Sequence, residues 1–186
     1  RFTEPGFLED LCDAGLKSAV VSLHSADPEV SDAMTMTPGS FARTVAGTRA
    51  ALAAGIDVGV HCVVERANVD GLEAHARFVV AELGEGEKAV THVSYSFPIG
   101  YRRRELYHGA IAPLDELRPR LSGAVRILRE HGIYVSFLGT SGFVPCAFDD
   151  PASLIASLPE RVTDEMRESR IFVEPCSRCS VRARCL

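Results

Sequence analysis

Four cysteines in the last part of the chain have the spacing of a metal site. Cys176 and Cys179 form a C-x-x-C pair, Cys185 follows them, and Cys146 precedes them beside Pro145. A C-x-x-C pair places two thiolates on one tight turn, and two further sulfurs complete a tetrahedral set of ligands. Such a set suits zinc and an iron–sulfur cluster equally well, and taken alone it favours structural zinc. Cys146 is the least typical ligand, because a cysteine beside a proline is often a small buried hydrophobe.

The composition is that of one domain and argues against two classes of partner. A chain of 186 residues that is 46% hydrophobic can bury one good core. Its net charge of −5 gives no broad positive surface for nucleic acid or an anionic membrane. No apolar run approaches the roughly 20 residues of a membrane helix, so we expect a soluble cytoplasmic protein. In such a chain, reduced thiols that bind a metal fit better than disulfides.

Upstream of the cysteine cluster, short β-branched runs alternate with longer stretches of helical period. We expect strands at residues 19–23, 56–64, 89–97 and 133–138. We expect helices at residues 5–14, 40–55, 68–83 and 113–132, with Ser40 and Asn68 as N-caps. The strand starts near residues 19, 56, 89 and 133 have the pitch of repeated βα units. This pattern predicts a parallel α/β fold.

Polar residues lie at the ends of these expected strands, where parallel α/β proteins gather their chemistry. Ser22 and His24 are two residues apart and share a face of the first strand, as Gly59 and His61 do on the second. Each histidine taken singly is more often a hydrogen-bonded structural residue than a ligand contact. Their shared location favours a binding site.

Three strings of residues, at 21–28, 39–55 and 58–68, resemble the later half of a radical S-adenosylmethionine (SAM) enzyme, in the order that this superfamily uses. The resemblance covers most of residues 3–138. It is greatest to the branch of molybdenum-cofactor cyclases and peptide-modifying maturases, which carry an auxiliary cluster in a C-terminal extension of the SPASM or twitch type. The four cysteines resemble that extension.

The resemblance implies a partial TIM-type (βα)n barrel, of which residues 1–138 form the later part, followed by an irregular cysteine-rich extension at 139–186. It also implies an N-terminal half that this chain lacks. The C-x-x-x-C-x-x-C motif of the catalytic cluster and the Gly-Gly-Glu segment that holds the SAM amine are both missing. We therefore assign the activity to a longer parent protein.

Individual roles follow from the same resemblance. Ser22 matches the strand-end serine that contacts SAM, and His24 belongs to the same string. His61 would face the cofactor or substrate, and Phe97 would lie where the sixth barrel strand runs beside the adenine. Gly59 would occupy a substrate-facing place, where its lack of a side chain leaves room or backbone access. Arg66 and Asn68 would serve the methionine carboxylate or cap the next helix, and the cap is the preferred role of Asn68. Cys146, Cys176, Cys179 and Cys185 would hold an auxiliary 4Fe–4S cluster.

The implied activity is reductive cleavage of SAM, with a 5′-deoxyadenosyl radical that modifies a peptide or a small molecule. An electron donor such as flavodoxin or ferredoxin would be a partner, and no nucleic acid or membrane is expected. The alternative is a non-catalytic α/β module with a structural zinc site and a protein-binding role.

Overall fold

A four-stranded, all-parallel sheet forms the centre of the fold. The structure is a computed structural model that describes residues 2–86, 88–98, 109–137, 148, 173–180 and 182. The strands lie in chain order, as β1 (Ser18–Ser22), β2 (Asp57–Val63), β3 (His92–Ser96) and β4 (Tyr134–Phe137). All four expected strands are present, and their parallel pairing confirms the predicted α/β fold class.

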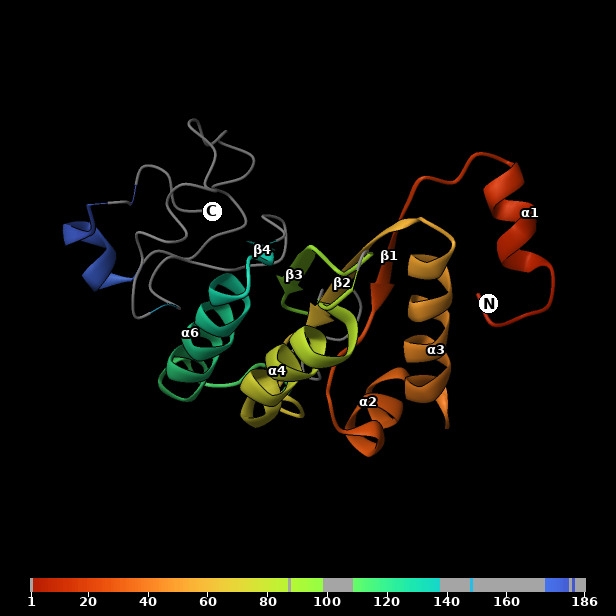
Figure 1. Cartoon of the computed structure of the whole chain (residues 1–186). Helices are drawn as coiled ribbons and strands as arrows, with labels where there is room; N and C mark the ends of the chain where they lie inside the picture. The colour runs from red at the N-terminus through yellow and green to blue at the C-terminus, as the bar shows by residue number, and fades with distance from the viewer. Residues whose placement is uncertain are drawn as a thin grey trace.

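One helix precedes the first strand, and the helices that connect the strands cover one face of the sheet. They are α1 (Phe7–Asp13), α2 (Pro28–Thr35), α3 (Ser40–Ala53), α4 (Leu72–Leu83) and α6 (Leu114–Glu130), with short 3₁₀ turns η1 (Val69–Gly71) and η4 (Glu174–Arg178). In Figure 1, α3, α4 and α6 stand side by side in front of the strands. In the described part of the chain, no helix is long and apolar enough to span a lipid bilayer.

The core lies between the sheet and this helix layer. Side chains alternate across a strand, so Val58, Val60 and Cys62 of β2 point to the same face, and each is 0% exposed. Tyr95 of β3 is equally buried on that face and stacks on Phe137 of β4 with ring centroids 6.2 Å apart. Burial of these apolar side chains on one face leaves the other face of the sheet for polar residues.

The start of α3 differs from the sequence-based prediction. Ser40 is not the N-cap: that place is taken by Gly39, whose φ of 72° suits glycine. The cap comes instead from Asp32 in α2, whose carboxylate accepts hydrogen bonds from the Phe41 amide at 2.8 Å, the Ser40 hydroxyl at 2.9 Å and the Gly39 amide. The Phe41 bond contributes most to lowering the pKa of Asp32. Helix α2, which the sequence analysis missed, therefore fixes the start of α3.

Asn68 was also predicted to be a helix cap, and this prediction was wrong. It precedes η1, but its side chain makes no capping hydrogen bond. Instead its amide forms hydrogen bonds with the backbone of His24, Val63 and Glu65, at the ends of β1 and β2.

The predicted division into a barrel part and an extension from residue 139 stays a prediction, because little of that extension is described. Within it, the structure describes Phe148 and the η4 segment.

Candidate functional site

A row of polar residues crosses the sheet on the face opposite the core. The strand register pairs Ser22 with His61, His61 with Ser94, and Ser94 with Ser136. One polar residue from each of the four strands therefore lies at the same level. We call Ser22, His61, Ser94 and Ser136 the polar row.

His61 is the centre of the polar row, and hydroxyl groups hold both of its ring nitrogens. Its Nδ1 lies 2.9 Å from the Ser94 hydroxyl, and its Nε2 lies 3.1 Å from the Ser96 hydroxyl. Burial lowers the pKa of His61 and outweighs the opposite effect of the hydrogen bond at Ser94. His61 is therefore neutral at pH 7, with its ring fixed between two strands.

A second row lies next to the first, toward the amino ends of the strands. It consists of Val20, Gly59, His92 and Tyr134. His92 Nε2 lies 2.7 Å from the Ser136 hydroxyl, which links the two rows. A Cβ atom on Gly59 would lie 3.3 Å from His92 Nδ1, so the missing side chain makes room for the His92 ring. Gly59 was expected to leave room for a ligand, and that space is instead filled by the protein.

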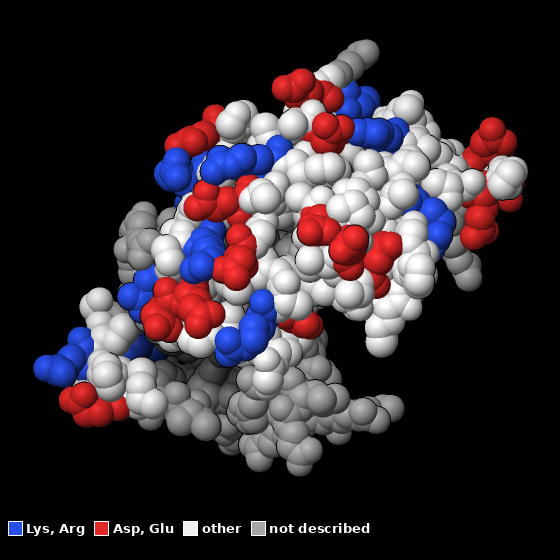
Figure 2. Space-filling model, turned by 90° about the horizontal axis from the view of Figure 1, so that it is seen from below, with Lys and Arg blue, Asp and Glu red and all other residues white. Residues whose placement is uncertain are grey.

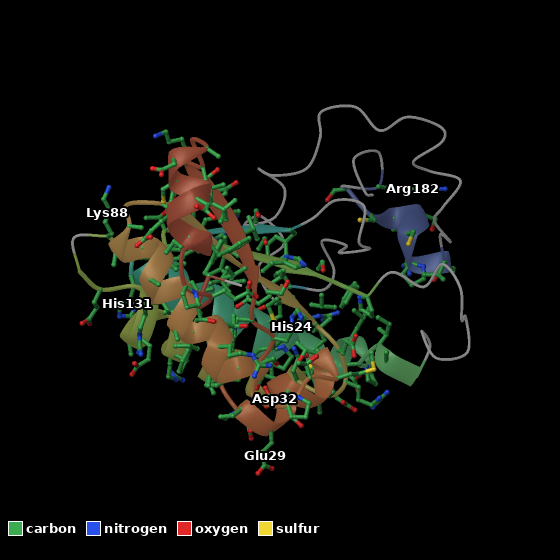
Figure 3. The ribbon with its side chains drawn as sticks, turned by 90° about the vertical axis from the view of Figure 1, so that its right-hand side faces the viewer. His24, Glu29, Asp32, Lys88, His131 and Arg182 are labelled. Carbon is green, nitrogen blue, oxygen red and sulfur yellow. The ribbon has the colours of Figure 1, made fainter. Side chains whose placement is uncertain are left out.

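His24 lies just beyond β1 and joins the site at the carboxyl ends of the strands. Its Nδ1 accepts a hydrogen bond from the Val63 amide at 3.2 Å. Burial lowers the pKa of His24, and the nearby His61 lowers it further. Figure 3 shows His24 among the elements of the fold, whereas Glu29 points away from the protein. His24 is thus a second neutral imidazole close to the polar row.

A pocket of about 390 Å³ opens beside the polar row, along β1. Its volume lies in the range of ligand sites, roughly 300–1,000 Å³. Ser22 belongs both to this pocket and to the polar row. The other polar lining residues come from α2 and the first turns of α3: Thr35, Ser40, Arg43 and Thr44.

Arg43 is the only cationic residue among the described residues that line the pocket, and the sequence analysis did not identify it. One guanidinium nitrogen donates to the Pro38 carbonyl at 3.1 Å. Within the described residues, Arg43 forms no salt bridge closer than 4 Å, although its charge contributes to lowering the pKa of Asp32. Arg43 lies three residues after Ser40, within the string that carried the resemblance. A cationic residue within that string could therefore have been identified as a candidate ligand contact from the sequence alone.

The structure separates Arg66 and Phe97 from the polar row. Arg66 donates to the Ile111 carbonyl at 3.4 Å and lies 3.9 Å from the Glu116 carboxylate of α6. Phe97 is 7% exposed and belongs to the hydrophobic core. Of the expected cofactor residues, Ser22, His24 and His61 lie together, and the roles of Arg66 and Phe97 stay predictions.

Two of the four expected metal ligands are described. Cys176 is half-buried in η4, Cys179 follows it and is exposed, and both are free thiols. Cys146 and Cys185 lie outside the described residues. In the part that is described, no group of three or more His, Cys, Asp or Glu side chains could hold a metal ion. The four-cysteine site therefore stays a prediction.

The surface charges give no sign of a polyanionic partner on the face shown in Figure 2. There, lysine and arginine side chains are interspersed with aspartate and glutamate. Among the described residues, Arg49 with Glu82 and Arg120 with Asp70 form such pairs of opposite charge. Exposed pairs of this kind are solvated and add little to stability.

No protein-family model matches this sequence, and a search of curated proteins also found no match. A likeness in three dimensions does exist. The chain is similar to a domain of pyruvate-formate lyase-activating enzyme from Bacteroides vulgatus ATCC 8482, with a TM-score of 0.50 and 13% sequence identity. The match covers 69% of this chain and 71% of that one. At this identity, the likeness supports the parallel α/β fold and nothing finer.

Proposed function

We propose that this chain is the later part of a radical SAM enzyme and that its polar row and pocket bind SAM. The observation that carries the proposal is that Ser22 belongs to both the polar row and the pocket. This serine stands in register with His61 in the polar row and also lines the pocket that contains Arg43. A single extended ligand that crosses Ser22 would reach both. The motif resemblance and the fold likeness to a domain of an activating enzyme support the same reading.

The chemistry of these residues suits the parts of SAM. Its carboxylate matches Arg43, because a guanidinium with no salt bridge to a described residue offers charge-assisted hydrogen bonds. Its ribose hydroxyls match Ser22 and the neutral imidazole of His61, which add no competing charge. We therefore assign the carboxylate to Arg43 in place of Arg66, which lies close to Glu116.

When SAM is bound and receives an electron from an iron–sulfur cluster, it supplies a radical that abstracts hydrogen from a substrate. The residues of this chain would contribute binding and orientation. The polar row would hold the ligand against the sheet, and the apolar pocket walls at Phe2 and Val21 would limit the access of water. The substrate in this proposal is a peptide or a small molecule, and the electron donor is a protein such as flavodoxin or ferredoxin.

The cysteine extension would hold an auxiliary 4Fe–4S cluster. Cys176 and Cys179 lie on one turn, where the Cys179 amide donates to the Cys176 carbonyl at 3.2 Å. Two thiols on one turn fit two of the four ligands of such a cluster. Cys146 and Cys185 are the proposed third and fourth ligands. Zinc in the same site would indicate the alternative function, a non-catalytic module that binds a protein partner.

Calorimetric titration with S-adenosylhomocysteine tests the SAM site without requiring a catalytic cluster. We expect Arg43→Ala to weaken binding by about tenfold or more, because a charge-assisted hydrogen bond is lost. Arg66→Ala is the matched control and should leave the affinity within about twofold. Equal affinities for wild type and Arg43→Ala, or a larger loss in Arg66→Ala, would contradict the assignment.

A further inference from the structure

Asn68 is a buried polar residue for which the proposed SAM site has so far required no role. It lies five residues after the end of β2 and is 3% exposed. It is the only asparagine in the chain, which also contains no glutamine, so it carries the only side-chain amide. A buried amide is costly unless its donors and acceptor are satisfied.

The nitrogen and the oxygen of this amide both have partners, which are three backbone groups and the buried Cys62 thiol, 3.7 Å from Nδ2. Nδ2 donates to the His24 carbonyl at 2.6 Å and to the Val63 carbonyl at 2.9 Å. Oδ1 accepts from the Glu65 amide at 2.8 Å. His24 follows β1, whereas Val63 and Glu65 belong to the end of β2. One side chain therefore connects the carboxyl ends of two neighbouring strands.

The two residues that Asn68 holds also contact each other through the His24 ring. The Val63 amide donates to His24 Nδ1 at 3.2 Å. For this bond to form, the backbone of His24 must stay at a fixed place beside Val63, and the Asn68 amide binds the carbonyls of these same two residues. With Nδ1 occupied as an acceptor, the neutral ring carries its proton on Nε2.

We propose that Asn68 is a positioning residue, which aligns the ends of β1 and β2 so that Val63 holds the His24 ring in one orientation and one tautomer beside the polar row. Its relevance to cofactor binding rests on the proposed function. The geometric part of the proposal does not, because it concerns contacts within the protein alone.

Of the side chains compared below, only that of asparagine can form all of these hydrogen bonds from position 68. Aspartate would keep an acceptor for the Glu65 amide but would place an oxygen against the carbonyls of His24 and Val63. Alanine would leave the Glu65 amide without this partner, and it would leave the carbonyls of His24 and Val63 with only the weak contacts of the Cys62 thiol, at 3.6 and 3.7 Å. Glutamine is one methylene longer, so its amide would not reach the same three groups from the same backbone. The specific variants therefore differ in expected effect, with aspartate the most damaging.

NMR tests the geometric part directly. In the ¹⁵N-labelled wild type, the NH₂ of the single side-chain amide should exchange slowly with solvent. The amide nitrogen of Val63 should show a scalar coupling to His24 Nδ1 across the hydrogen bond. Asn68→Ala should abolish that coupling. The matched control is Thr48→Val, which removes another buried hydrogen bond, from the Thr48 hydroxyl to the Thr44 carbonyl, and this bond lies within α3. It should leave the coupling unchanged.

Retention of the coupling in a folded Asn68→Ala variant would overturn the proposal, and so would a rapidly exchanging NH₂ in the wild type. The second observation needs no variant, so the test holds even if the substitution prevents folding. Titration with S-adenosylhomocysteine then adds the functional part, with a loss of about tenfold expected for Asn68→Ala and none for Thr48→Val. If the wild type does not bind this ligand while the coupling depends on Asn68, the SAM proposal fails and the positioning role stands.

Discussion

At the scale of single residues, the candidate site combines neutral imidazoles and hydroxyls with one arginine. Burial lowers the pKa values of His24 and His61, so neither ring adds positive charge at pH 7. Of the described residues that line the pocket, Arg43 is then the only one with a full positive charge. A site of this kind can distinguish the charged end of a ligand from its hydroxylated end, as binding of SAM would require.

A third histidine, His75 of α4, lies in the core and gives a pH-dependent stability. It is 0% exposed, and its ring nitrogens have no hydrogen-bond partner among the described residues. Burial lowers its pKa to about 4 from 6.5; the backbone at Leu23 acts in the opposite direction but does not offset burial, since no hydrogen bond of good geometry forms. We treat His75 as a structural residue, packed edge-on against Tyr95.

This histidine should make the protein less stable as the pH falls. Because the folded pKa lies below the unfolded one, the unfolded state takes up a proton first, and stability declines between about pH 6.5 and 4 by about 3 kcal/mol. His75→Leu should remove most of this slope in urea unfolding measured across that range. His131→Gln, which removes an exposed imidazole, is the control. An unchanged slope in His75→Leu would show that other groups cause it.

At the scale of elements, the site depends on strands that present alternate residues to two environments. On β2, even-numbered residues from Val58 to Cys62 pack under the helices, and Gly59 and His61 face the other way. The absence of a side chain at Gly59 lets the His92 ring lie against β2 and reach Ser136. Contact between neighbouring strands thus continues on the polar face of the sheet.

A larger side chain at position 59 should disturb this arrangement. Gly59→Val would place methyl groups where the His92 ring lies, and we expect a loss of about 1–3 kcal/mol in the free energy of unfolding from overpacking. Val20→Thr, at a side chain that is 65% exposed, should change it by less than about 0.5 kcal/mol. Urea denaturation measures both. Equal stability of Gly59→Val and wild type would mean that the space above β2 is empty.

The elements themselves were largely predictable, because periodicity is a local property of the sequence. The four strands and their parallel order followed from the spacing of β-branched runs. Helix α2 was missed, although Asp27 accepts from the amides of Glu29 and Val30 at its start and Pro28 is the first helical residue. An eight-residue helix offers little periodicity, so its cap was the main available signal.

The contacts between elements were less predictable. The cap of α3 comes from Asp32, nine residues before Phe41, and Asn68 binds a carbonyl at His24, 44 residues away. Local patterns place a polar residue on a face but do not fix the register between strands. Sequence reasoning therefore found Ser22 and His61 separately, and the pairing that joins them with Ser94 came from the structure.

At the scale of the whole molecule, a parallel sheet carries the polar row on one face and its helices on the other, and α2 and α3 contribute to the pocket beside β1. The fold likeness to a domain of pyruvate-formate lyase-activating enzyme agrees with this architecture. Fold alone does not determine function, so the proposal depends on the site residues and on the metal that the cysteines bind.

The most direct test of the radical SAM proposal is the iron, sulfide and zinc content of this protein purified without oxygen. We predict about four irons and four sulfides per chain, bound by the cysteine extension. Cys179→Ala should lose this metal, whereas Cys12→Ala, at a cysteine packed against the core, should retain it. Stoichiometric zinc without iron would contradict the iron–sulfur account and favour a structural site in a non-catalytic module.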